Sequence, residues 1–513
     1  MIESARSSFS KGCLILVFFP AAQAVNYHKR RGTPFKIFMR KRETPAMTQF
    51  QKRPQMVLVL LGVITIALVA SFGPVGADKT VHAQKTSPCV ANPAWFTSPS
   101  PPDGNNFPQG TALTNCDFHQ WAEQMFLWLT LPSNPKDPRS PRNFEVMAYP
   151  DDLFTKSGTG PTMGYPGRGL NIRQPVKLLA RTEKSNENLD PDAVFQSGPG
   201  RKILVDQKGQ FVYYSSYLDK DFWNFIVKQQ LYKLANLQNV PSTTDFPINT
   251  LELKASWRIA ALLDKNGKPT QTFIADAAKR FYTTTAKISP VRLQDGKLIE
   301  DKVPSHQMLA TVALVGLHVV GIVKGHPEFI WATFEHLDNA PDYSATPAGA
   351  TNPQTNGPWS FYKSGTAAAF CNQFDSANPL LPVSVLRVTP WGGGSEPNQQ
   401  NQTNIQSLNA SVQQALRKIR PVWANYELAG ATWTGGTIPL NNGAPANLQR
   451  GSIALANTSM ETFQQNATCF ACHNSGRHAV AVGDSAQIIG GKILNLSHFV
   501  VNYQASQQAK ARP

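Results

Sequence analysis

A short cysteine motif near the C-terminus constrains this chain more than any other feature. It reads Cys469-Phe470-Ala471-Cys472-His473. Two cysteines that are separated by two residues and followed at once by a histidine are the pattern for covalent attachment of c-type haem. The two sulfurs add to the two vinyl groups of one porphyrin, which places the adjacent imidazole under the iron. The motif therefore predicts one covalent haem c bound by Cys469 and Cys472, with His473 as an iron ligand.

Two other kinds of site use a Cys-x-x-Cys pair. A structural zinc site needs four ligands, and no second Cys-x-x-Cys occurs in the sequence. A thioredoxin-like dithiol lies near the start of a βαβ unit, whereas this motif follows a polar, helix-like run at residues 460–465. The context favours haem over both alternatives, and the single Cys-x-x-Cys-His predicts a single haem.

The N-terminal region has the composition of an export signal. The pair Lys52-Arg53 precedes an apolar run at residues 56–70, and small residues follow up to Ala77 and Ala83. This order of basic, apolar and small-residue regions is typical of a secretory signal peptide. Cleavage after Ala77 or after Ala83 fits equally well.

We therefore expect residues 1–83 to be a basic prefix and signal peptide, with a possible true start at Met47, and the mature protein to lie in the periplasm. An uncleaved membrane anchor is the alternative, because residues 56–77 are just long enough to span a bilayer. The formal net charge of +16 is concentrated in this region. From Gln84 onward the chain has 37 Lys and Arg against 30 Asp and Glu. That part also lacks a basic stripe with interleaved aromatics, so we expect no nucleic-acid binding.

The remaining cysteines agree with export. The expected mature part has five cysteines. Three of them are left if the haem takes Cys469 and Cys472, and an oxidising compartment permits one disulfide among them. Cys89 and Cys116 are the preferred pair, because both lie in a Pro/Gly/Asn-rich segment that has little core of its own. Cys371 is then expected to be a buried thiol.

Hydrophobic periodicity predicts a mixed fold. Strands are expected at residues 203–205, 211–217, 251–263, 280–287, 307–323 and 328–337, and helices at 117–130, 219–238 and 404–419. The run 307–323 is apolar on both sides, as in a central strand, and 328–337 is expected to pair with it. Strands and helices do not alternate regularly. The predicted fold class is therefore α+β, with a mostly antiparallel sheet core, flanking helices and a short, mostly helical haem c segment at the C-terminus.

A loop rich in Gly, Pro, Asn and Gln at residues 391–401 predicts a domain boundary. We expect an α+β domain at 84–400 and a haem c-binding segment at 401–513.

The sixth ligand of the iron decides the chemistry of such a haem. Nearby candidates are His498, His478 and Met460, and no methionine follows His473. His498 is preferred as the second iron ligand, because the chain between it and the motif is long enough to cross the porphyrin. Remote candidates are His306, His318, His326 and His336. His318, inside an apolar strand, is expected to be a hydrogen-bonded core residue.

Several stretches of the chain together carry a family resemblance. They are residues 254–257, 280–284, 312–323 and 331–339 and the terminal Cys-x-x-Cys-His. With these, the chain resembles a group of large, largely uncharacterised bacterial proteins classed as cytochrome c family. The resemblance covers most of the mature chain, and it assigns a role only to Cys469, Cys472 and His473.

Three functions are consistent with these observations. The first is a periplasmic monohaem c-type cytochrome that transfers single electrons through its haem. Its redox partner protein would be a dehydrogenase or a terminal acceptor. The second is a haem enzyme of peroxidase or oxygenase type with an open or displaceable sixth position, in which His336, His318 or Glu335 acts as acid or base. The third is a binding or sensory module whose haem is structural or reports the redox state. A single haem without a recognised catalytic pattern favours electron transfer.

Overall fold

The structure is a computed structural model of the chain. It describes residues 88–155, 158–162, 164–166, 176–177, 197, 202–294, 297–301, 303–343, 357–393, 398–440, 448–466, 468–482 and 485–511. The predicted prefix and signal peptide at 1–83 lie outside the described residues, so cleavage, anchoring and the start at Met47 stay predictions. No helix in the described part is long and apolar enough to cross a membrane.

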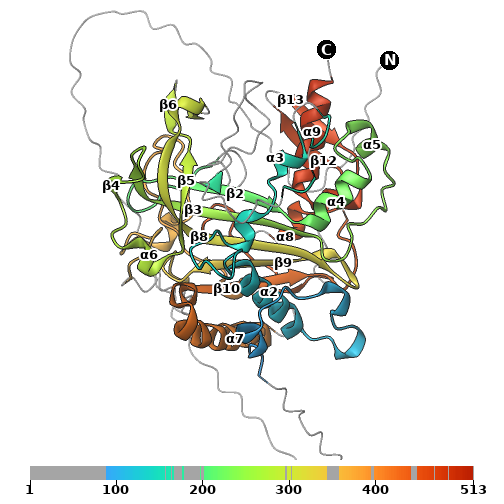
Figure 1. Cartoon of the computed structure of the whole chain (residues 1–513), viewed down its shortest axis with the longest axis horizontal. Helices are drawn as coiled ribbons and strands as arrows, with labels where there is room; N and C mark the ends of the chain where they lie inside the picture. Colours follow the sequence, from blue (N-terminus) through green and yellow to red (C-terminus); the bar gives the residue numbers. More distant parts are fainter. Residues whose placement is uncertain are drawn as a thin grey trace, which may run out of the picture. The chain divides into compact units, whose positions relative to one another are not determined.

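Among the described residues, nine strands form one sheet built around β8, Met308–Val323. β8 pairs antiparallel with β3, Leu251–Leu263. It also pairs antiparallel with β5, Thr283–Ile288, and with β9, His326–His336, along successive parts of its length. Figure 1 shows β3, β8 and β9 running side by side. The prediction of a central strand at 307–323, paired with the strand that follows it, is confirmed.

The other strands extend this sheet or form small hairpins. The sheet also contains β1 (Val176–Lys177), β2 (Val212–Leu218), β4 (Pro269–Thr272), β10 (Tyr426–Trp433) and β11 (Arg450–Gly451), and the hairpins are β6 (Val291–Gln294) with β7 (Lys297–Glu300) and β12 (His478–Val482) with β13 (Ser485–Ile489). Every strand pair in the described part is antiparallel except β1 with β5. The fold class is α+β, as predicted.

Helices in the described part of the chain are mostly short. They are α1 (Ala94–Thr97), α2 (Asn115–Leu129), α3 (Pro150–Leu153), α4 (Lys220–Lys228), α5 (Leu234–Asn239), α6 (Ala277–Arg280), α7 (Asn398–Ile419), α8 (Cys469–Cys472) and α9 (His498–Lys510). β10 follows the boundary that the sequence predicts near residue 400, and it pairs with β9. The sheet therefore takes strands from both sides of that boundary.

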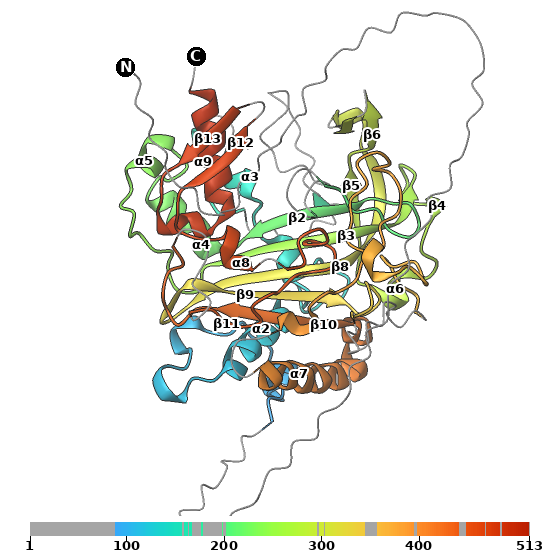
Figure 2. The same cartoon turned by 180° about the vertical axis from the view of Figure 1, so that it is seen from behind.

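One face of the sheet packs against α2 and α7 (Figure 2). Phe126 of α2 stacks on Phe334 of β9, with ring centroids 4.3 Å apart. Phe118 of the same helix stacks on Trp433 of β10 at 3.8 Å. The predicted apolar stripe of α7 joins this core through Ile405, Leu408, Val412 and Leu416. This face is the main hydrophobic core.

The opposite face of the sheet is apolar at one end and polar in its middle. At the apolar end, Val320 and Trp331 lie in one buried cluster with Phe470 of the cysteine motif. In the middle, Lys254 of β3 is paired in register with His318 of β8. Figure 1 shows α4, α8 and α9 on this side of the sheet. The cysteine motif thus lies on this face, which we call the polar face, next to Lys254 and His318.

The single helix predicted at residues 219–238 is wrong, because the structure has α4 and α5 with a turn between them. Gln230 adopts a left-handed backbone conformation with φ of 51°. The Leu231 N–H then donates to the Ile226 carbonyl at 2.9 Å and ends α4. The turn brings Leu231 and Leu237 into the same buried cluster as Phe222 of α4. One straight helix would have spread these apolar side chains around its axis.

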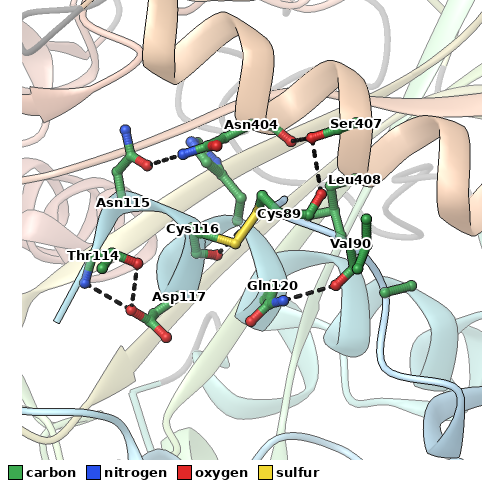
Figure 3. The surroundings of a disulfide bond; sticks show 12 residues. Cys89, Val90, Thr114, Asn115, Cys116, Asp117, Gln120, Asn404, Ser407 and Leu408 are labelled. Atoms are coloured by element: carbon green, nitrogen blue, oxygen red, sulfur yellow. Dashed lines mark hydrogen bonds between the residues drawn. A yellow bond between two sulfur atoms is a disulfide. The ribbon is translucent and has the colours of Figure 1, made fainter. Parts of the chain in front are cut away.

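The predicted disulfide between Cys89 and Cys116 is confirmed. It joins the irregular N-terminal segment to the start of α2 (Figure 3). The same segment also contacts α7, since the Ser407 hydroxyl donates to the Cys89 carbonyl at 2.9 Å. Cys371 is a free, buried thiol, as expected. The crosslink therefore anchors a segment that also packs on the main core through Trp95, Phe96 and Phe107.

Replacing Cys89 and Cys116 together by alanine is expected to lower the free energy of unfolding by about 2–4 kcal/mol, because the uncrosslinked chain gains entropy when it unfolds. Urea unfolding of the variant and the parent protein measures this difference. Cys371→Ala is the matched control and should lose only about 1 kcal/mol of buried apolar contact. Equal losses in both variants would contradict a specific contribution from the disulfide.

Candidate functional site

The cysteine motif forms a single helical turn that is anchored on the sheet. Cys469–Cys472 make up α8, and the His473 N–H donates to the Cys469 carbonyl at 2.8 Å. Phe470, inside the turn, is fully buried and lies edge-on to Trp331 of β9 with ring centroids 6.3 Å apart. Because Phe470 points into the core, its neighbours on the same turn stay near the surface. Both motif cysteines are half-buried, and neither is part of a disulfide.

The two thiols do not resemble a redox-active pair. Such pairs depend on a cysteine whose pKa is lowered toward neutrality. Burial, assisted by the negative charge of Glu461, instead raises the pKa of Cys469 to about 12. Cys469 is therefore a neutral thiol over the physiological pH range. This observation disfavours the thioredoxin-like alternative.

The His473 ring is held in the form that can ligate a metal. Its Nδ1 lies 3.0 Å from the Leu496 carbonyl, to which it can only donate. Burial lowers the pKa of His473 well below its usual value, with the neighbouring His498 adding to the effect. In a neutral ring with the proton on Nδ1, the lone pair is on Nε2, and a backbone carbonyl in this position commonly orients a ligating histidine. The Trp331 ring packs against the His473 ring with centroids 4.1 Å apart.

His498 is brought directly beside His473. It begins α9, and the two rings stack with centroids 3.7 Å apart and planes 20° apart. Burial lowers the pKa of His498 to about 4. Its Nε2 lies 3.1 Å from the Cys472 carbonyl, which can only accept, so the proton of the neutral ring is on Nε2. Two axial ligands of one iron point at each other from opposite sides of the porphyrin, whereas stacked rings lie side by side. His498 as the sixth ligand stays a prediction, and it requires the ring to turn away from Cys472.

The other nearby candidates have structural partners. His478, on β12, lies 6.0 Å from the ring of His498, and its Nε2 bonds the Asn474 carbonyl at 3.0 Å. Met460 is buried in a separate hydrophobic cluster with Tyr214. Neither side chain is directed by its contacts toward His473.

Three of the remote histidines are held by other groups. The structure pairs His306 with Asp301 at 2.8 Å and His326 with the buried Glu328 at 2.9 Å. His336 stacks on a phenylalanine, its Nε2 donates to a backbone carbonyl at 2.9 Å, and its Nδ1 accepts a backbone N–H at 3.0 Å. Both ring nitrogens of His336 are occupied, so it is a poor acid–base candidate.

Glu335, the other acid–base candidate on β9, belongs to a buried ion pair. It lies 3.1 Å from the guanidinium of Arg387 and accepts the Thr458 N–H at 2.8 Å. These contacts tie the chain that leads to the cysteine motif onto the sheet. Glu335 therefore has a structural role.

His318 differs from the other remote histidines. It lies in the middle of β8, yet its side chain is 21% exposed, and its Nε2 is 3.1 Å from Glu461 Oε1. It also acts electrostatically on His473. The expectation of a hydrogen-bonded residue is confirmed, and the structure adds that the residue is near the motif.

Sequence reasoning missed two residues of this neighbourhood, Lys254 and Glu461. Glu461 acts electrostatically on Cys469 and on Lys254, and Lys254 acts on His498. The available signal was weak: Lys254 lies on the polar side of an otherwise apolar strand. Nothing in the sequence indicated that Glu461 would lie near Lys254.

No protein-family model matches this chain, and neither the comparison with curated proteins nor that with solved structures finds a match. Among the described residues, no group of three or more His, Cys, Asp and Glu side chains is arranged to hold a metal ion. The assignment of the site therefore rests on the chemistry of its own residues.

The donor set fits haem c. Cys469 and Cys472 are thiols outside any disulfide and lie on one helical turn. The neutral His473 follows them, and the bond from Nδ1 to the Leu496 carbonyl puts the lone pair on Nε2. His318 and Glu461, both partly exposed, show that solvent reaches the polar face next to the motif.

In protein produced without haem, iodoacetamide is expected to alkylate Cys469 on the order of a thousandfold more slowly at pH 8 than in the urea-unfolded chain. The thiolate is the reactive form, and little of it exists below a pKa of about 12. The rate should rise steadily with pH. Peptide mass spectrometry distinguishes Cys469 from Cys472 and Cys371. Rapid alkylation at pH 7 would contradict the buried neutral thiol and would favour a redox dithiol.

Proposed function

We propose that this protein is a periplasmic monohaem c-type cytochrome that transfers single electrons. Cys469 and Cys472 would hold the haem through thioether bonds, and His473 would ligate its iron. The observation that carries the proposal is the His473 ring. It is neutral, the Leu496 carbonyl orients it, and it directly follows two cysteines that form no disulfide. The haem would supply a reversible one-electron redox centre.

The chain's own residues would tune that centre. The Leu496 carbonyl fixes the His473 tautomer and makes the ring a stronger donor. Phe470 and Trp331 cover one side of the motif and exclude water. A buried, apolar environment of this kind is one of the levers by which a protein sets a reduction potential.

We also propose a cellular location and a class of partner for this cytochrome. A disulfide between Cys89 and Cys116 supports an oxidising compartment, which agrees with the export signal in the sequence. The partner would be a redox protein, either a dehydrogenase that donates the electron or a terminal acceptor. Contact with a membrane would require an uncleaved signal segment.

A haem enzyme of peroxidase or oxygenase type is the second candidate. It is favoured by one observation, the partly exposed His318–Glu461 pair on the polar face beside the motif. An imidazole with a carboxylate partner can act as a general acid or base. This function would require an iron position open to a small ligand.

Absorption spectra of the mature protein, recorded in the ferric, ferrous and ferrous plus carbon monoxide states, distinguish the two candidates. Electron transfer with two strong protein ligands predicts a ferrous spectrum that carbon monoxide leaves unchanged. His498→Ala should then open the iron to carbon monoxide, and the matched His478→Ala variant should not. An immediate shift in the parent protein would contradict the electron carrier and favour the enzyme.

A further inference from the structure

A small polar patch interrupts the buried surface of the sheet beside the cysteine motif. Lys254 on β3 and His318 on β8 are cross-strand partners. They are partly exposed, whereas the residues around them in both strands are buried. Glu461 reaches them from the chain that precedes the motif, and its side chain is 32% exposed. Water therefore reaches three ionisable groups near the proposed haem.

The hydrogen bonds around His318 suit a site that gains and loses a proton. Asn457 Nδ2 donates to Thr333 Oγ1 at 2.8 Å. The Thr333 hydroxyl can then donate to His318 Nδ1, 2.9 Å away. His318 Nε2 carries the proton and donates to Glu461 Oε1 at 3.1 Å. Both nitrogens of the neutral His318 ring therefore have a hydrogen-bond partner.

The protonated ring is satisfied by the same partners. Both ring nitrogens are donors in the imidazolium. Nδ1 would then donate to Thr333 Oγ1, whose second lone pair is available beside the bond from Asn457. Glu461 continues to accept from Nε2. Both ring nitrogens of His318 are therefore paired in either charge state, and protonation turns the Thr333 hydroxyl hydrogen away from Nδ1.

The acidic partner stays ionised. Burial raises the pKa of Glu461, but the charges of His318 and Lys254 and the Asn457 N–H hold it below its usual value. Its second oxygen accepts the Asn457 N–H at 2.9 Å. The Glu461 carboxylate is therefore a charged acceptor for His318 Nε2.

The remaining charged and titratable groups face the patch from the packed elements. β3 contributes Lys254 and also Glu252, which accepts a hydrogen bond from Ser497 at 2.6 Å. β2 contributes Tyr214, whose ring lies 5.1 Å from the Lys254 ammonium. β9 contributes Glu335, which is neutralised by Arg387.

The cysteine motif and α9 complete this environment. The motif contributes Cys469, a neutral thiol, and His473, and α9 contributes His498. Both histidines are neutral, because burial lowers their pKa values. Burial also lowers the pKa of Lys254 and raises the pKa of Glu252 to about 8. Glu252 can therefore change its charge between pH 5 and pH 9, and the His318→Gln variant is needed to assign the bound proton to His318.

We propose that His318, with Glu461 as its partner, is a proton-binding site that couples proton uptake to reduction of the haem. The inference rests on the proposed function. An electron added to a haem near His318 adds negative charge in a partly buried site, and negative charge there stabilises the imidazolium. The protein would therefore take up an electron and a proton together over part of the pH range.

Potentiometric titration of the mature protein between pH 5 and pH 9 tests this site. The midpoint potential should be constant at the lowest and the highest pH values and should fall with rising pH in the range between them. A tenfold difference in proton affinity between the two redox states corresponds to a fall of about 59 mV for a one-electron couple. His318→Gln should abolish the fall. Glu461→Gln should move it to lower pH, because the imidazolium loses its carboxylate.

His306→Gln is the matched control, since His306 is also paired with a carboxylate, Asp301, at 2.8 Å but is 56% exposed. It should leave the titration unchanged. A parent protein whose potential is independent of pH would overturn the inference, and so would an undiminished fall in His318→Gln. If His318→Gln does not fold, Thr333→Val replaces it as the test, because this variant removes the hydroxyl partner of His318 Nδ1. It should shift the pH range in which the potential falls. An unchanged range would overturn the inference. A protein without covalent haem yields no potential and refutes the proposed function instead.

Discussion

The structure depends on one strand, β8, that is hydrogen-bonded on both edges and covered on both faces. β3 lies along one edge, and β5 and β9 share the other. Backbone groups buried in this way must be paired, and the long antiparallel neighbours satisfy that requirement. Every other layer is arranged around this strand: α2 and α7 on one face, and the cysteine motif on the other.

The two faces of the sheet meet different physical demands. The face toward α2 and α7 is stabilised by apolar and aromatic packing, such as Phe126 on Phe334. The opposite face contains charged groups, and buried charges are costly unless they are paired. Glu335 pairs with Arg387, and the backbone and side chain of Thr458 both donate to Glu335. The polar face thereby fixes the segment that leads into α8, and through it the position of Cys469.

Local patterns in the sequence predicted a large part of this architecture. The alternation at residues 251–263 gave the bounds of β3, and the doubly apolar run gave the central strand. The pairing of Cys89 with Cys116 followed from their shared, core-poor segment. These features are encoded by neighbouring residues, so one sequence is enough to detect them.

Features that depend on distant contacts could not be predicted. Glu461 meets His318 across 143 positions of the chain, and that contact depends on how the last segment crosses the sheet. The break between α4 and α5 depends on Gln230, a residue without a strong turn preference in the sequence. His498 as an iron ligand stays a prediction, and its stacking on His473 follows from the docking of α9 and not from spacing.

Denaturing mass spectrometry of the mature protein, made in cells that attach haem to exported proteins, tests the central claim most directly. The account predicts that the chain carries the mass of one haem after unfolding, and that a Cys469→Ala, Cys472→Ala variant does not. A parent chain that has the mass of the polypeptide alone would contradict the account.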